Sequence, residues 1–189
     1  MNTAIDRKTF LKNSLSCAAG CLALATCPSV LHGAPAAPAA GPDAQSATTI
    51  LDWLSPFIVR EERNLSRADL IKLLEERGRL CCRSLDFRQK LVAESQGDTD
   101  KLVALMGRIV GAENCRREGD TIVLVYPMTK CGCGRTPQRA PAADDPYCEC
   151  SKANNQKLFE IVSGRPVRVE VLESPRRGGS CCRFRIQLG

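Results

Sequence analysis

Apolar side chains recur at helical spacing in four stretches of the first half of the chain. The stretches are residues 50–59, 66–78, 80–94 and 100–110. Each predicts an amphipathic helix with one buried face, and together they indicate a helical core. Ser66 and Asp98 stand at positions where N-caps are preferred. Gly78 and Gly111 would end the second and the fourth helix.

The second half of the chain changes to strand patterns. Residues 121–125 form an apolar run typical of a buried strand, and residues 167–171 and 182–188 alternate apolar with polar side chains. Between these strands, Ser151 suits a helix N-cap and Gly164 a helix end. The pattern therefore predicts one more helix beside a small sheet.

The last two strands are predicted to form a hairpin, because residues 174–180 contain the proline and glycines of a turn. Matching their buried faces fixes the register. The predicted pairs are Val167–Leu188, Val169–Ile186 and Val171–Phe184. One step further, the same register sets Glu173 opposite Cys182 on the buried side. A buried carboxylate beside a buried thiol is costly unless something such as a cation satisfies both.

The predicted fold class is α+β, with N-terminal helices packed on a small, mainly antiparallel sheet that ends in a C-terminal β-hairpin. We expect one cysteine-rich domain over residues 50–189, preceded by a linker at 41–49. Residues 1–40 have a charged start, a short apolar middle and small-residue cleavage sites, which is typical of an export signal. The segment Arg7–Lys12 resembles a twin-arginine signal with lysine at the second arginine. The expected destination is the bacterial periplasm or cell envelope.

Charge and histidine content limit the functions that the chain could have. The formal net charge is +6, but aromatic residues make up only 4% of the chain, which disfavours a nucleic-acid interface. The single histidine, His32, lies in the predicted signal. A mature domain without histidine excludes Cys–His and Ser–His–Asp catalysis and every histidine-ligated metal site.

The twelve cysteines carry the candidate chemistry, and six of them fall between positions 131 and 182. The candidate metal ligands are Cys131, Cys133, Cys148, Cys150, Glu173 and Cys182. Cys148 and Cys150 are predicted at a helix N-terminus, where the helix dipole stabilises thiolates. Zinc takes four ligands, usually at least two of them thiolates. An iron–sulfur cluster fits the spacing less well, and disulfides or buried free thiols are the alternatives.

Two more cysteines stand side by side at positions 81 and 82. Adjacent helical residues face different sides, so one of the pair can be buried and the other exposed. A bond between adjacent cysteines is strained. An alternative interpretation includes Cys81 or Cys82 in the metal site.

From Tyr147 onward the chain resembles the C-terminal half of the 4-vinyl reductase domain group. The segments that carry the resemblance are YCECS, FEIVSGRPVRVEVLES and RRGGSCCRFRIQL. It is also similar to uncharacterised bacterial cysteine-rich proteins and to the L-2-amino-thiazoline-4-carboxylate hydrolase-like group. The resemblance implies a small domain that binds or senses a hydrophobic small molecule and often carries zinc. It assigns the final ligand to Cys182 and an upstream acid to Glu173, while Ser174 stands where zinc-bearing relatives have cysteine.

Three functions are therefore weighed. The first is an exported thiolate metal-binding domain, with zinc as its metal, that binds or senses a small hydrophobic molecule. The second is a cysteine-dependent hydrolase of a small heterocycle or thioester, with Cys148 or Cys150 as nucleophile. The third is a disulfide-stapled interaction protein. The expected partner is a small-molecule ligand, with membrane contact only through the export signal; whether the chain forms a homodimer is left open.

Overall fold

The computed structural model describes residues 44–133 and 136–189, with side chains from Leu51 onward. The predicted export signal lies outside the described residues. The helices are α2 (Ala44–Glu61), η1 (Glu62–Asn64), α3 (Arg67–Ser84), α4 (Asp86–Ser95), α5 (Thr99–Val110), η2 (Ala112–Asn114), α6 (Cys148–Ser163) and η3 (Pro175–Arg177). The strands are β1 (Cys115–Glu118), β2 (Thr121–Tyr126), β3 (Val167–Glu173) and β4 (Cys182–Leu188). None of the helices described is long and apolar enough to span a membrane.

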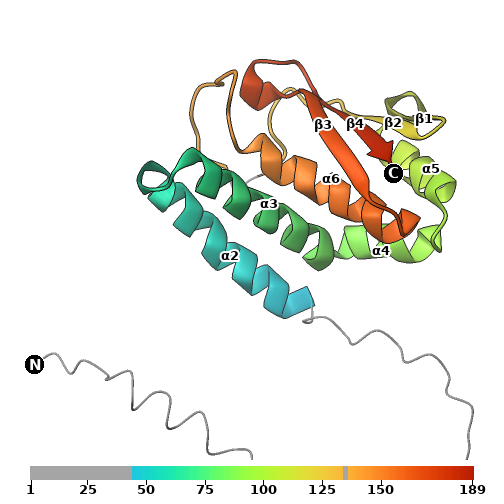
Figure 1. The fold of residues 1–189 in the computed structure, drawn as a ribbon, viewed down its shortest axis with the longest axis horizontal. Coiled ribbons are helices and arrows are strands. Elements are labelled where there is room, and N and C mark those ends of the chain that lie inside the picture. The colour runs from blue at the N-terminus through green and yellow to red at the C-terminus, as the bar shows by residue number, and fades with distance from the viewer. Residues whose placement is uncertain (1–43, 134–135) are drawn as a thin grey trace, which may run out of the picture. The chain divides into compact units, whose positions relative to one another are not determined.

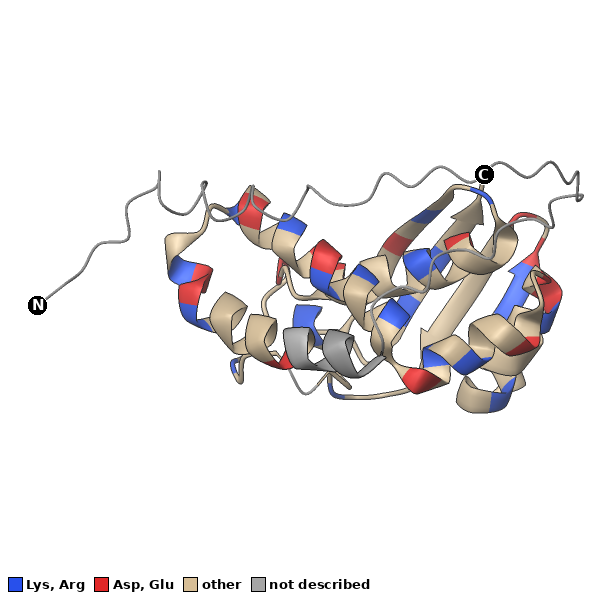
Figure 2. Ribbon diagram, turned by 90° about the horizontal axis from the view of Figure 1, so that it is seen from below, with Lys and Arg blue, Asp and Glu red and all other residues tan. Residues whose placement is uncertain are grey.

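The four strands form one antiparallel sheet in the order β1-β2-β4-β3. Helix α6 packs against β3 and, on its other side, against α3, and α2 packs on α3 (Figure 1). Acidic and basic residues are interspersed over helices and strands (Figure 2). The predicted α+β class is confirmed.

Two apolar clusters hold these layers together. The larger one lies between the sheet and helices α4, α5 and α6, and Leu158, Phe159 and Ile186 are fully buried in it. The smaller one joins α2, α3 and the start of α6, around Leu74 and Tyr147. Burial of these side chains is the main favourable term for the fold.

Several local predictions are confirmed. The Asp98 carboxylate accepts from the backbone N–H groups of Asp100 and Lys101 at the start of α5, and the helix ends at Gly111. Helix α6 ends at Gly164, which has a left-handed backbone. The three predicted pairs of the β3–β4 hairpin are all present.

The prediction that a helix ends at Gly78 is wrong, because α3 continues to Ser84. A Cβ atom at Gly78 would lie 2.2 Å from the carbonyl oxygen of Cys150 in α6. The glycine therefore serves the close approach of two helices and does not stop one. The chain instead breaks at Leu85, which has an extended backbone, so the predicted helix over 80–94 is divided between α3 and α4.

Three further boundaries differ from the predictions. Helix α2 begins at Ala44, inside the predicted linker 41–49. Strand β1 was not predicted, because its sequence CRRE is short and has no apolar alternation. Helix α6 begins at Cys148 and not after Ser151, since the Asp145 carboxylate accepts the backbone N–H of Tyr147 and organises an earlier start.

Candidate functional site: a thiol-lined cavity

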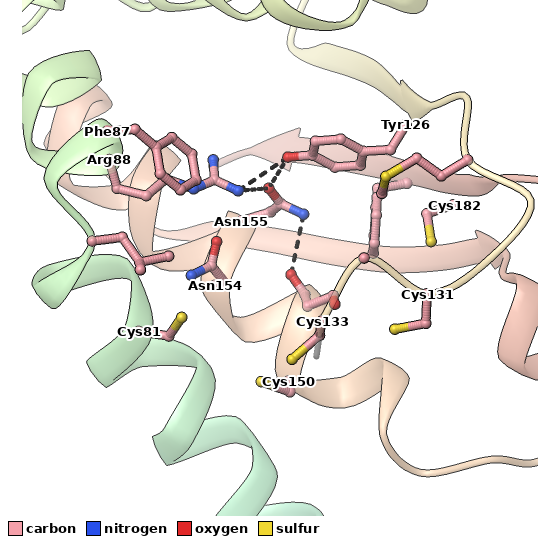
Figure 3. A pocket seen from close by; sticks show the side chains of 15 residues that line it. Cys81, Phe87, Arg88, Tyr126, Cys131, Cys133, Cys150, Asn154, Asn155 and Cys182 are labelled. Carbon is pink, nitrogen blue, oxygen red and sulfur yellow. Dashed lines mark hydrogen bonds between the residues drawn. The ribbon is translucent and has the colours of Figure 1, made fainter. Parts of the chain in front are cut away.

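A cavity of about 410 Å³ opens where four parts of the fold meet (Figure 3). Its walls come from the end of α3 with the start of α4, the end of β2 with the following loop, the first turns of α6, and the start of β4. This volume lies within the range of small-molecule sites. Apolar side chains cover much of the wall, and they are Leu85, Phe87, Met128 and Phe184.

Five cysteines line this cavity: Cys81, Cys131, Cys133, Cys150 and Cys182. The structure therefore brings four of the six candidate ligands to one place, from a loop, a helix and the closing strand (Figure 3). Cys81 joins them from α3, while its neighbour Cys82 is buried in the main core. None of the nine cysteines in the described ranges is in a disulfide.

Cys148 is placed close to this group but does not line the cavity. It is buried, and its Sγ donates to the Ser174 hydroxyl oxygen at 3.0 Å. Burial raises the pKa of the Cys148 thiol more than its hydrogen bond with Ser174 and the charge of Arg177 lower it. The sequence predicted that the helix N-terminus would favour a thiolate here, but burial favours the neutral thiol.

Glu173 is not brought to the cavity, and its predicted register is wrong. A β-bulge between Val171 and Glu173 shifts the pairing, so Glu173 lies opposite Arg183. Cys182 instead pairs with Tyr126 of β2. The Glu173 carboxylate accepts from the backbone N–H and the hydroxyl of Ser180, at 2.7 and 2.9 Å, which lowers its pKa. It organises the hairpin turn, and its other carboxylate oxygen lies 3.7 Å from the Arg183 guanidinium, so protein groups alone partner this carboxylate.

Two of the thiols on the cavity wall are shifted toward their neutral form. Burial raises the pKa of Cys150 to about 11 and is the main reason that the pKa of Cys182 is raised to about 12, with a smaller contribution from the neighbouring thiols Cys131 and Cys148. In the described ranges, no three His, Cys, Asp or Glu side chains are grouped so that they could hold a metal ion. The donor chemistry fits a soft or borderline metal, but the thiols do not form a ligand group in this arrangement.

A buried arginine lies directly behind Cys150. The Nε of Arg77, a residue only 1% exposed, donates to Cys150 Sγ at 3.4 Å. Its guanidinium also lies over the Tyr147 ring, 5.6 Å from the centroid. This charge lowers the pKa of Cys150, although burial dominates. Arg77 would stabilise Cys150 whenever it becomes a thiolate.

An ion-pair cluster fixes the loop that connects the two C-x-C segments. The buried Asp145 carboxylate accepts from Arg176 at 2.6 Å and from Arg139 at 3.3 Å. Arg176 also donates to the carbonyl oxygen of Pro137, and its guanidinium lies over the Tyr147 ring. These contacts fasten the loop to η3 and so position the start of α6.

The far end of the cavity is polar, and sequence reasoning missed it. The Nη2 of Arg88 donates to the Tyr126 hydroxyl at 3.1 Å and to Asn155 Oδ1 at 3.3 Å, and the Tyr126 hydroxyl donates to the same Oδ1 at 2.9 Å (Figure 3). A signal was present, because Arg88 falls three residues after Leu85 and seven after Cys81, on the apolar side of its predicted helix. A charged residue on the apolar face of a helix is costly to bury, so it indicates that the side chain has a specific partner or function.

Fold and site together define an α+β domain with a cavity that is lined by thiols and by a hydrogen-bonded arginine, tyrosine and asparagine. Comparison with known protein families and with curated proteins finds no match to this chain.

Proposed function

We propose that this protein is an exported domain that binds a metal ion, zinc, through cavity thiolates and takes up a small hydrophobic molecule in the same cavity. The observation that carries the proposal is that Cys131, Cys133, Cys150 and Cys182, from three separate segments, line one cavity of about 410 Å³. Buried thiols with no histidine nearby suit zinc better than a hard cation. The resemblance of the C-terminal half to the 4-vinyl reductase domain group points the same way.

Binding would require the thiols to lose protons and move together. A divalent cation supplies the attraction that deprotonates a coordinating thiol. Arg77 supports this step, because its contact with Cys150 Sγ already favours the negative form of that residue. The raised pKa values of Cys150 and Cys182 imply that metal affinity increases with pH.

The two alternatives have weaker support. A hydrolase needs a thiolate nucleophile, yet burial raises the pKa of both Cys148 and Cys150, and no histidine of the described ranges could act as base. A disulfide-stapled interaction protein would need bonds that are absent from the described ranges.

Cobalt titration of the reduced, metal-free full chain tests the metal site, since Co²⁺ replaces Zn²⁺ and reports thiolate ligation by a sulfur-to-metal absorption band. We expect one Co²⁺ per chain, with Zn²⁺ displacing it. Cys182→Ser should weaken binding by on the order of 100-fold or more, because about 10–16 kcal/mol is shared among four ligands.

Cys181→Ser is the matched control for this variant. Cys181 is the adjacent residue and is buried, but it does not line the cavity. It should bind cobalt as the unmodified chain does. A wild-type chain that is folded and reduced but shows no sulfur-to-cobalt band would overturn the metal proposal. Equal losses in the two variants would show that Cys182 is not a specific ligand.

A further inference from the structure

Arg88 is a buried cation without an acidic partner. The residue is 6% exposed, and in the part of the chain that the structure describes no carboxylate lies within 4.0 Å of its guanidinium. Its acceptors are neutral: the Tyr126 hydroxyl, Asn155 Oδ1 and, at 4.0 Å, the sulfur of Met106. Its Nε has no hydrogen-bond partner among the described residues. Burying a charge in this way is costly.

A second buried arginine shows how this fold neutralises such a charge elsewhere. Arg176 is 9% exposed, and its guanidinium meets the Asp145 carboxylate at 2.6 Å. Among the described residues Arg88 has no such neighbour, and it lines the cavity. A molecule that enters the cavity can therefore supply the carboxylate that the protein does not place beside Arg88.

We infer that the cavity takes a small organic carboxylate, whose anionic group binds Arg88 and whose apolar body lies against Leu85, Phe87 and Phe184. Arginine suits this role, since its guanidinium keeps its charge and makes strong, charge-assisted hydrogen bonds to carboxylates. Tyr126 and Asn155 hold the guanidinium in place by their bonds to Nη2. The inference names the ligand class of the cavity in the proposed function, but it does not require the metal.

The test uses the reduced, metal-free full chain and two matched probe pairs. The first pair is 3-phenylpropanoate and its neutral amide, and the second is acetate and acetamide. Calorimetry and thermal unfolding should show that each acid binds more tightly than its amide. For the larger pair we expect a ratio of roughly 10- to 100-fold, the usual effect of a hydrogen-bonded charge.

Arg88→Met should abolish this discrimination and raise the melting temperature of the ligand-free chain, because it removes a buried charge that only neutral acceptors and the Phe87 ring stabilise. Arg83→Gln, which changes an exposed arginine of α3, should leave both properties unchanged. A wild-type chain that fails to prefer either acid over its amide overturns the inference. So does an Arg88→Met chain that still prefers the acids, or one that is less stable without ligand.

Cys182→Ser separates this inference from the metal proposal. This variant should lose cobalt binding and keep its preference for 3-phenylpropanoate over the amide. If cobalt binds to the unmodified chain and the acids are not preferred, the carboxylate inference alone fails. If the acids are preferred and cobalt does not bind, the metal proposal alone fails.

Discussion

Replacing Gly78 with alanine tests whether the close approach of α3 and α6 holds the cavity together. The added Cβ would lie 2.2 Å from the carbonyl oxygen of Cys150 and 3.1 Å from the Ala153 Cβ. The first neighbour is backbone, so it cannot rotate away, and one helix must shift. The Asn154 amide, which donates to the carbonyl oxygen of Gly78 at 3.3 Å, would be displaced as well.

The expected change in the free energy of unfolding is the balance of two effects. Overpacking costs up to about 3 kcal/mol. Alanine in a helix interior gains back about 1 kcal/mol relative to glycine. We therefore expect Gly78→Ala to lower the free energy of unfolding by about 2 kcal/mol. The shift acts on Cys150, so the variant should also bind cobalt more weakly than the unmodified chain.

Urea unfolding of the reduced chain measures the first effect, and Gly107→Ala in α5 is the control. There the nearest atom to an added Cβ is the Ala112 Cα at 3.3 Å, so a small adjustment suffices and the helix gain offsets it. Gly107→Ala should change the unfolding free energy by less than about 1 kcal/mol. A Gly78→Ala chain as stable as the Gly107→Ala chain would refute the reasoning.

Two further predictions concern charge. The pKa values of Cys150 and Cys182 are raised from 9.0 to about 11 and about 12, so the stability that their neutral forms contribute is complete below pH 9. This stability is lost as the pH rises through the folded-state pKa values. The urea midpoint of the reduced, metal-free chain should therefore fall from pH 9 upward. A midpoint that stays constant to pH 11 would contradict this prediction. Asp145→Asn should cost about 3–5 kcal/mol in urea unfolding, because it leaves the Arg176 guanidinium buried without its carboxylate, and a loss below about 1 kcal/mol would show that the pair is dispensable.

The sequence predicted features that depend on local pattern. The alternation of residues 167–171 and 182–188 gave the hairpin pairs correctly, since a one-residue slip would expose a whole buried face. The same extrapolation failed at Glu173, because a β-bulge inserts a residue that no alternation records. The prediction that a helix ends at Gly78 failed for a related reason. A glycine that ends a helix and one that lets two helices approach look identical until the partner helix is placed.

The candidate site, like the fold, was predicted only in part. The sequence named Cys131, Cys133, Cys148, Cys150 and Cys182 as candidate ligands, and the structure places all of them except Cys148 in the lining of one cavity. The sequence could not assign a role to Arg88, because that role depends on whether a carboxylate lies beside its guanidinium in the folded protein. Only the packed structure shows that its acceptors are neutral, while Arg176 has a carboxylate.

Charge compensation connects the two proposals. Arg77 contacts Cys150, and Arg88 lines the cavity together with Tyr126 and Asn155. Each of these buried cations favours negative charge in the groups beside it. Thiolates around a divalent metal would supply that charge beside Arg77, and a carboxylate would supply it beside Arg88. The proposed metal would use the cysteine thiolates and the proposed acid would use Arg88, so the two ligands need not compete.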